Sequence, residues 1–173
     1  MQAILTRRSV RRFIPNKPIS KETLLKIIKA GQYAPSAHNK QPWEFLVVED
    51  KKFLEDLPNY QQWTTFAKYG SVAIFILADM EQGYNREGEN WNFAEIDCSL
   101  AIQNMTLAAH DQGLGSTICG ISPMPETIQK FKQLLDLPGH IHPVALLILG
   151  HPEGEPKQPE TRFNESKIHW DKY

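Results

Sequence analysis

The sequence is poor in cysteine. Its only two cysteines, Cys98 and Cys119, are separated by twenty residues and show no Cys-x-x-Cys spacing. Zinc and iron–sulfur sites need closely spaced thiolate or imidazole ligands, so we expect no metal centre and read both residues as reduced thiols. The histidines are scattered as well, and we expect them to be solvated or hydrogen-bonded: His110, His140, His142 and His151.

The sequence also lacks an excess of charge and a long apolar run. Nineteen lysines and arginines face twenty aspartates and glutamates, which gives a formal net charge of −1. This balance does not favour nucleic acid or an anionic membrane as a partner. The longest apolar runs, 72–78 and 144–149, are too short to cross a bilayer, and arginines follow residues 1–5 too closely for a secretory signal. We therefore expect a cytoplasmic protein.

The periodicity of the apolar residues predicts an α+β chain. No repeat or low-complexity tract interrupts it before residue 151, so we expect a single domain over residues 1–173. Residues 93–112 are apolar around almost the whole circumference of a helix, which indicates burial on several sides, in a core or at a subunit interface. We expect strands at 43–48, 72–78 and 144–149, and helices at 3–8, from the Ser20 cap to Gly31, at 93–112 and from Pro125 to about 135.

Residues 151–173 have a different composition from the rest. They contain three prolines, many charges and no sustained apolar period. A disordered tail is one interpretation. We favour an extended arm that lies on another surface, such as that of a second subunit, because four large apolar side chains would be costly to leave in water. These are Phe163, Ile168, Trp170 and Tyr173.

A basic segment opens the chain, with four arginines among residues 7–12. If a short helix ends and the chain turns near Ser9, then Arg7, Arg8, Arg11 and the Ser9 hydroxyl could converge on one phosphate through charge-assisted hydrogen bonds. Two other interpretations stay open. The segment could be a solvated face that forms weak surface ion pairs, or a nucleic-acid patch, although the latter would need more basic surface.

One further segment suits a flat ligand, and a glycine-containing segment needs a separate interpretation. Residues 34–45 read Ala-Pro-Ser-Ala-His-Asn-Lys-Gln-Pro-Trp-Glu-Phe, in which small residues let backbone groups approach a heterocycle, and Asn39 and Gln41 offer amides. A plain helix-to-strand connection is the alternative. Residues 113–120 contain Gly-x-Gly but follow a helix, so they are not a Rossmann phosphate loop, and a helix C-cap at Gly113 or Gly115 is the simple structural interpretation.

Taken together, these segments resemble the flavin-binding signature of the nitroreductase family, through Arg-Arg-Ser-x-Arg and Pro-Ser-x-x-Asn-x-Gln-Pro-Trp. The resemblance resumes at 143–152 and 167–170, and leaves only 50–70 and 79–92 without a clear pattern. It implies a nitroreductase-like α+β fold with a mixed central sheet flanked by helices. It also implies a homodimer in which the C-terminal arm, 151–173, extends onto the partner subunit.

The resemblance further implies an FMN-dependent oxidoreductase. Hydride would pass from NADH or NADPH through flavin N5 to a small electron-poor acceptor such as a nitroaromatic or quinone, with ping-pong kinetics. Because the flavin carries the chemistry, no catalytic side chain is required. In similar proteins the basic segment and the Pro-Ser loop reach each flavin from different subunits. The implied cofactor contacts are Arg7, Arg8, Ser9, Arg11, Pro35, Ser36, Ala37, Asn39, Ile118, Cys119, Gly120 and, in the arm, Arg162.

Other functions remain open from the sequence. A relative could use the same flavin for azoline dehydrogenation, flavin destruction or reductive dehalogenation. A flavin- or nucleotide-binding regulatory module without turnover, or a nucleic-acid binder that uses the arginines, would belong to a different class. Asp97 is expected to make a structural hydrogen bond rather than to act as a base, and the aromatic residues between 60 and 93 are expected mainly in packing.

Overall fold

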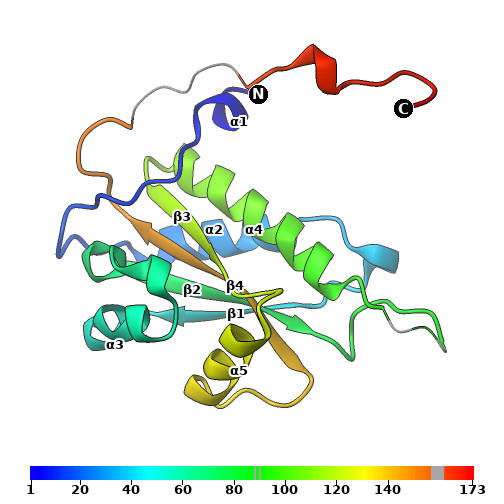
Figure 1. The fold of residues 1–173 in the computed structure, drawn as a ribbon. Helices are drawn as coiled ribbons and strands as arrows, with labels where there is room; N and C mark the ends of the chain where they lie inside the picture. The colour runs from blue at the N-terminus through cyan, green and yellow to red at the C-terminus, as the bar shows by residue number, and fades with distance from the viewer. Residues whose placement is uncertain (88, 90, 157–161) are drawn as a thin grey trace.

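The computed structural model describes residues 1–87, 89, 91–156 and 162–173. Four strands form one sheet in the order β1 (Trp43–Val48), β2 (Val72–Asp79), β4 (Ile141–Gly150) and β3 (Gly115–Gly120) (Figure 1). All three ladders are antiparallel. The α+β class is confirmed, but the expected mixed sheet needs correction. Among the described residues parallel pairing is confined to an isolated bridge between Ser9 and Ser116, because the N-terminal segment forms no continuous ladder with β3 there.

The strand β3 was missed by the sequence analysis. Residues 43–48 form the predicted strand, and the strands predicted at 72–78 and 144–149 are found slightly extended. The stretch that becomes β3 is small and polar, with little of the β-branched and aromatic content that marks a strand. It is held at the sheet edge by pairing with β4. A side chain at Gly115 would place Cβ 2.7 Å from Cγ1 of Val10, so the close approach of the N-terminal segment requires glycine there.

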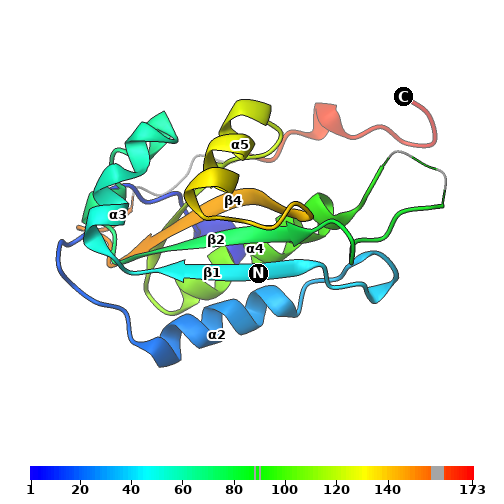
Figure 2. The same ribbon diagram turned by 90° about the horizontal axis from the view of Figure 1, so that it is seen from below.

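Helices cover both faces of the sheet (Figures 1 and 2). Ser20 caps the predicted helix, its hydroxyl accepting the Thr23 N–H at 3.2 Å. Two hydrogen bonds end the long helix at Gly113, whose φ is +73°. The Leu114 N–H donates to the Ala109 carbonyl, and the Gly113 N–H donates to the His110 carbonyl. Of the two predicted glycines, Gly113 is therefore the one that ends the helix, directly after the cap residue Gln112, whereas Gly115 begins β3. The helices are α1 (Gln2–Thr6), α2 (Lys21–Gln32), α3 (Lys51–Asp56), α4 (Ala94–Asp111) and α5 (Pro125–Leu134).

The central strand β2 separates two apolar cores. Its alternate side chains Val72, Ile74 and Ile76 join the core under α2 and α4, while Ala73, Phe75 and Leu77 join the core under α3 and α5. Burial of each large side chain contributes about 1.5–3 kcal/mol, which makes the sheet a rigid base for the loops at its ends.

The outer side of α4 stays exposed. Its inner residues Cys98, Ala101 and Met105 are fully buried, whereas Ile96 and Leu100 are 56% and 42% exposed. The apolar circumference predicted for this helix is therefore present, but one chain covers only part of it.

The end of the C-terminal arm lies away from both cores. Residues 162–173 are all exposed and form one short 3-10 helix, Glu165–Lys167 (Figure 1). Phe163 and Trp170 are 73% and 83% exposed. Across the described part of the chain, no helix combines the length and apolar character needed to cross a membrane.

Candidate functional site

The basic segment lies against the edge strand β3. Val10 N–H donates to the Ser116 carbonyl at 2.9 Å, and the Thr117 hydroxyl donates to the Val10 carbonyl. The predicted helix at 3–8 ends earlier, at Thr6, so Arg7 and Arg8 already belong to the extended segment. These bonds carry Arg11 to the middle of β3, beside the stretch 118–120 that the resemblance singled out.

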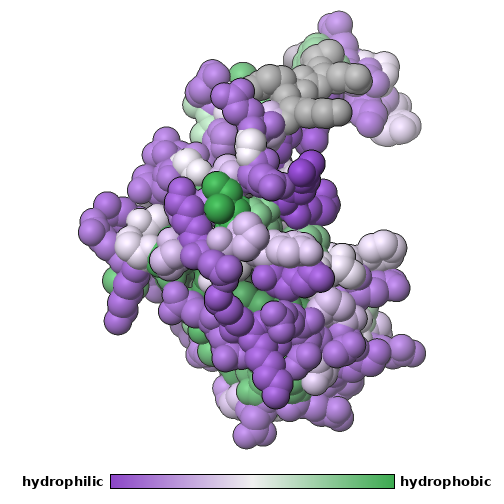
Figure 3. Space-filling model, turned by 90° about the vertical axis from the view of Figure 1, so that its left-hand side faces the viewer, coloured by the Kyte–Doolittle hydropathy of each residue, from purple (hydrophilic) through white to green (hydrophobic). Residues whose placement is uncertain are grey.

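Arg11 lines three pockets, and two of these form the candidate site. One has a volume of about 440 Å³ and is lined by residues 8–12 and 152–156. The other has a volume of about 640 Å³ and lies where β3 ends, and its lining comprises Arg11, Gln61, Gln62, Trp63, Thr65, Phe66, Thr117, Ile118, Cys119, Gly120 and Met124. The side of the molecule that carries residues 7–18 is largely hydrophilic, with small apolar patches between (Figure 3).

The smaller pocket is lined by Arg8, Arg11 and Arg12 together with Glu153 and Glu155. Arg8 is half-buried and donates to the carbonyls of Leu5, at 2.8 Å, and Arg7, while its Nε is buried without a hydrogen-bond partner among the described residues. Burial, and then the charges of Arg162 and Arg7, lower the pKa of Arg8. The arm therefore places Arg162 near the basic segment. Like charges gathered in this way repel one another, and a bound anion would relieve that repulsion.

Arg12 differs from its neighbour Arg11. Its guanidinium pairs with the Glu153 carboxylate at 2.9 Å, so its charge is balanced within the chain. Arg11 is exposed, and its guanidinium carbon lies 5.9 Å from the centroid of the Phe66 ring. Of these two arginines, Arg11 is thus the better placed to meet an anionic ligand.

The end of β3 presents one apolar side chain and one buried thiol. Ile118 is 41% exposed, whereas Cys119 is only 6% exposed, with its Sγ 3.9 Å from the Trp63 carbonyl. Burial raises the pKa of Cys119 to about 11, although the charge of Arg11 acts in the opposite direction. The thiol is therefore neutral at pH 7 and a poor nucleophile.

Gln61 is a site residue that the sequence analysis missed. It is 6% exposed, and its Nε2 donates to the Gly120 carbonyl at 2.7 Å, which ties the end of β3 to the wall of the larger pocket. Gln62 and Thr65 line the same wall. These residues lie in 50–70, where short 3-10 helices replace any period, so only a polar residue among aromatic ones could have marked them.

The Pro-Ser loop forms a tight turn after α2. His38 and Asn39 have φ values of +50° and +54°, and the Ser36 hydroxyl accepts the Gln41 N–H at 2.9 Å. The Gln41 amide donates to Asn39 Oδ1 at 3.0 Å, so this amide pair is partly satisfied inside the loop. Pro35 is exposed at its start.

Asp97 on α4 anchors this loop. Its carboxylate oxygens accept the Ala37 N–H at 3.1 and 3.2 Å, and its side chain is almost fully buried. Burial raises the pKa of Asp97, although the bond from Ala37 opposes this. The expectation of a structural hydrogen bond is confirmed.

The structure keeps the Pro-Ser loop apart from the basic segment. The loop is bound at Asp97, whereas the end of α1 meets the other end of α4, where Thr6 Oγ1 lies 2.7 Å from His110 Nε2. The α4 residues of these two contacts, Asp97 and His110, are thirteen positions apart, which corresponds to about 20 Å along the helix axis. One chain therefore brings together the basic segment, residues 118–120 and Arg162, but not Pro35, Ser36, Ala37 and Asn39.

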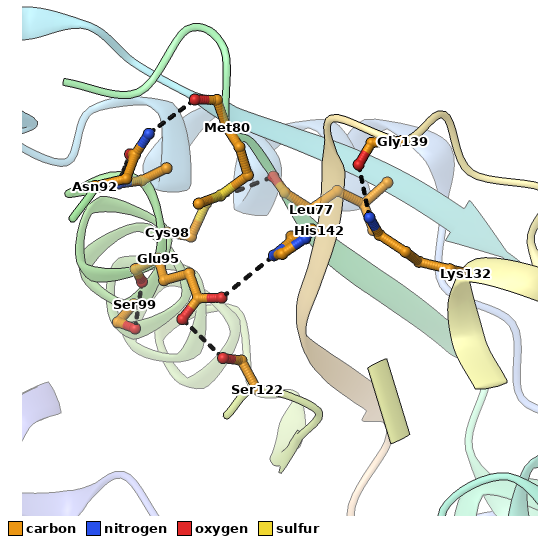
Figure 4. Close-up of polar contacts among 11 residues, drawn as sticks. Leu77, Met80, Asn92, Glu95, Cys98, Ser99, Ser122, Lys132, Gly139 and His142 are labelled. Atoms are coloured by element: carbon orange, nitrogen blue, oxygen red, sulfur yellow. Dashed lines mark hydrogen bonds and ion pairs between the residues drawn. The ribbon is translucent and has the colours of Figure 1, made fainter. Parts of the chain in front are cut away.

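A polar cluster braces the first turn of α4 (Figure 4). Glu95 accepts the Ser122 hydroxyl at 2.7 Å, and its other oxygen lies 3.7 Å from His142 Nδ1. Because the serine is bonded to the carboxylate rather than to the imidazole, this is not a nucleophilic triad. Among the described residues no three metal-ligating side chains gather at one point.

Comparisons with known proteins agree with the resemblance. The model of the nitroreductase family matches residues 4–151. A protein of Archaeoglobus fulgidus with the provisional name NADH dehydrogenase/NAD(P)H nitroreductase is 34% identical, over 100% of this chain and 98% of its own. A crystal structure with the same provisional name, from Parabacteroides distasonis, has a TM-score of 0.90 at 32% identity and covers 99% of this chain and 97% of that one.

One solved relative is a complex. It is a provisionally named nitroreductase of Desulfovibrio desulfuricans bound to FMN, with a TM-score of 0.80 and 29% identity, covering 99% of this chain and 96% of that one.

Proposed function

Because the chain belongs to the nitroreductase family, we propose that it is an FMN-dependent oxidoreductase that passes hydride from NADH or NADPH to a small electron-poor acceptor, such as a nitroaromatic or a quinone. The relatives named as NAD(P)H nitroreductases and the FMN complex support this activity. When bound, FMN supplies the two-electron chemistry, and the protein contributes position and electrostatics.

The observation that carries the proposal is the pair of pockets joined at Arg11. The smaller pocket suits a phosphate, because Arg8, Ser9 and Arg11 line it, Arg162 lies near, and the buried Arg8 Nε lacks a partner among the described residues. The larger pocket suits a ring system, because it has the larger volume and is lined by residues 117–120 and by mixed polar and apolar side chains. The residues present therefore fit FMN.

The roles of the chain's own groups follow from this fit. Arg8, Arg11 and Arg162 would balance the phosphate charge, and the Ser9 hydroxyl would accept or donate a hydrogen bond beside them. Ile118, Cys119 and Gly120 would border the ring, with Gln61 fixing the Gly120 backbone. The Cys119 thiol, neutral at pH 7, would act as a small wall residue rather than as a nucleophile.

We propose that the site is completed by a second copy of the chain. The Pro-Ser loop lies about 20 Å along α4 from the contacts of α1, so it would reach the flavin held by the partner's basic segment. The exposed Ile96 and Leu100 on α4, and the arm with Phe163 and Trp170, offer the apolar area that a stable homodimer needs.

The proposal is tested by spectroscopy and kinetics on the purified protein. We expect a yellow protein that NADH or NADPH bleaches under anaerobic conditions, and whose colour returns on addition of a quinone or nitroaromatic. Since both substrates would use one flavin face in turn, double-reciprocal plots should be parallel. A yellow protein indifferent to both nucleotides would indicate a binding module instead, and a colourless protein that shifts DNA would indicate a nucleic-acid binder.

A further inference from the structure

We propose that His38 donates the proton that the acceptor takes up when it is reduced. This inference rests on the proposed function, since it assumes that the Pro-Ser loop borders a flavin. Hydride transfer needs no catalytic side chain, but a quinone that gains only a hydride becomes an anion. Its second oxygen must still be protonated, and a positioned acid makes that step faster.

The loop geometry holds the His38 ring in one orientation. The residue has a φ of +50°, in the left-handed region that few non-glycine residues adopt, inside a turn fixed by the bonds of Ser36 and Ala37. Its ring stacks on Tyr84, with centroids 3.9 Å apart and planes 24° from parallel. The side chain is exposed, and no hydrogen bond joins its ring nitrogens to another of the described residues. An imidazole that is fixed but not hydrogen-bonded is available to a ligand.

The stack continues into an aromatic surface that suits a planar acceptor. Tyr84 lies 6.0 Å from Trp91 and 6.2 Å from Phe93, and those two rings meet edge to face at 5.4 Å. Trp91 is 42% exposed and Phe93 37% exposed, so both present ring area to solvent. One bond holds this segment near the loop, in which Gln82 Nε2 donates to the Lys40 carbonyl at 2.8 Å. Within the segment, the Phe93 N–H donates to the Tyr84 carbonyl at 3.0 Å.

His38 is the one titratable side chain among residues 34–39 of the loop. Eight other charged or titratable groups belong to the loop, to the first turn of α4 and to the segment 80–93: Lys40, Glu95, Asp97, Glu81, Tyr84, Arg86, Glu87 and Glu89. Asp97 is bonded to the Ala37 N–H and Glu95 to the Ser122 hydroxyl, so both carboxylates are engaged elsewhere.

The proposed step balances. The quinone gains a hydride, which carries two electrons, at one carbonyl oxygen, and a proton from the His38 imidazolium at the other. The product is the neutral hydroquinone, the reduced cofactor is oxidised, and the neutral imidazole recovers a proton from water. A one-electron acceptor such as ferricyanide takes up no proton, so its reduction should not depend on His38.

The test compares reoxidation of the NADPH-reduced holoenzyme by menadione, a quinone, and by ferricyanide, in rapid-mixing experiments. His38→Phe keeps an aromatic ring for the Tyr84 stack and removes the acid. We expect its menadione rate to fall about a hundredfold and to lose the decline with rising pH that an imidazolium donor predicts for the parent protein, while its ferricyanide rate stays within twofold. His140→Phe, in the loop before β4, is the matched control and should leave both rates unchanged.

A second readout does not depend on turnover. The His38 ring resonances are followed by NMR in the oxidised holoenzyme, with and without 1-naphthol, which resembles the product and cannot be reduced. We expect 1-naphthol to shift them, and the midpoint of their titration to match that of the menadione rate. A menadione rate within twofold of the parent in His38→Phe, an equal loss with ferricyanide, or resonances that ignore 1-naphthol would each overturn the assignment. Lack of flavin or of bleaching by NADPH would instead refute the proposed function.

Discussion

Replacing Arg11 by alanine tests the phosphate anchor most directly. Arg11 lines both adjoining pockets, yet its one described side-chain contact is with the Phe66 ring at 5.9 Å. Loss of that exposed contact costs about 0.5–1 kcal/mol of stability, so the variant should fold. Loss of a charge-assisted contact to a phosphate costs about 1.5–3 kcal/mol. Since about 1.4 kcal/mol corresponds to a tenfold change, the Kd for FMN should rise roughly ten- to a hundredfold.

The assay is fluorescence titration of the apoprotein with FMN and with riboflavin, which lacks the phosphate. Arg11→Ala should weaken FMN binding and leave riboflavin binding within about twofold. Arg12→Ala is the matched control, because Arg12 already pairs with Glu153, both side chains being largely exposed, and such a pair contributes about 0–1 kcal/mol. The reasoning is refuted if Arg11→Ala binds FMN as the parent does, if riboflavin affinity falls equally, or if Arg12→Ala has the same effect.

Three further predictions concern the anchor of the Pro-Ser loop, the thiol and the arm. Burial raises the folded-state pKa of Asp97, so the folded chain holds its proton to higher pH than the unfolded chain does, and stability falls as pH rises through that window. Asp97→Asn should lack this pH-dependent contribution to stability. Urea unfolding of both proteins between pH 4 and 7 should therefore show the parent losing stability relative to the variant, and parallel pH profiles would contradict this. Cys119→Ser should keep FMN and most turnover, because the pKa of about 11 leaves the thiol neutral; loss of turnover with FMN still bound would make the thiol a participant. Truncation after Gly154 removes Arg162 and the exposed apolar residues of the arm. Light scattering and absorbance should then show loss of the dimer and of FMN together. A truncated protein that stays yellow and dimeric would contradict a role of the arm in dimerisation and FMN binding.

The sequence by itself determined the elements whose signals are local. The Ser20 cap, the apolar period of α4, its C-cap at Gly113 and the strand at 43–48 all follow from neighbours within one or two turns, and each is found where it was predicted. Residue types also marked the basic segment and the Pro-Ser loop, because guanidinium groups suit a phosphate and small turn residues form a tight loop.

Only the tertiary structure decided where these segments lie relative to one another. The strand β3 forms because β4 and Val10 pair with a stretch of weak strand propensity, and Gln61 enters the site through a bond to Gly120, 59 residues away. The separation of the Pro-Ser loop from the basic segment is set by two contacts at opposite ends of α4. Contacts between residues so distant in sequence leave no local period, because their free energy depends on how the whole chain packs.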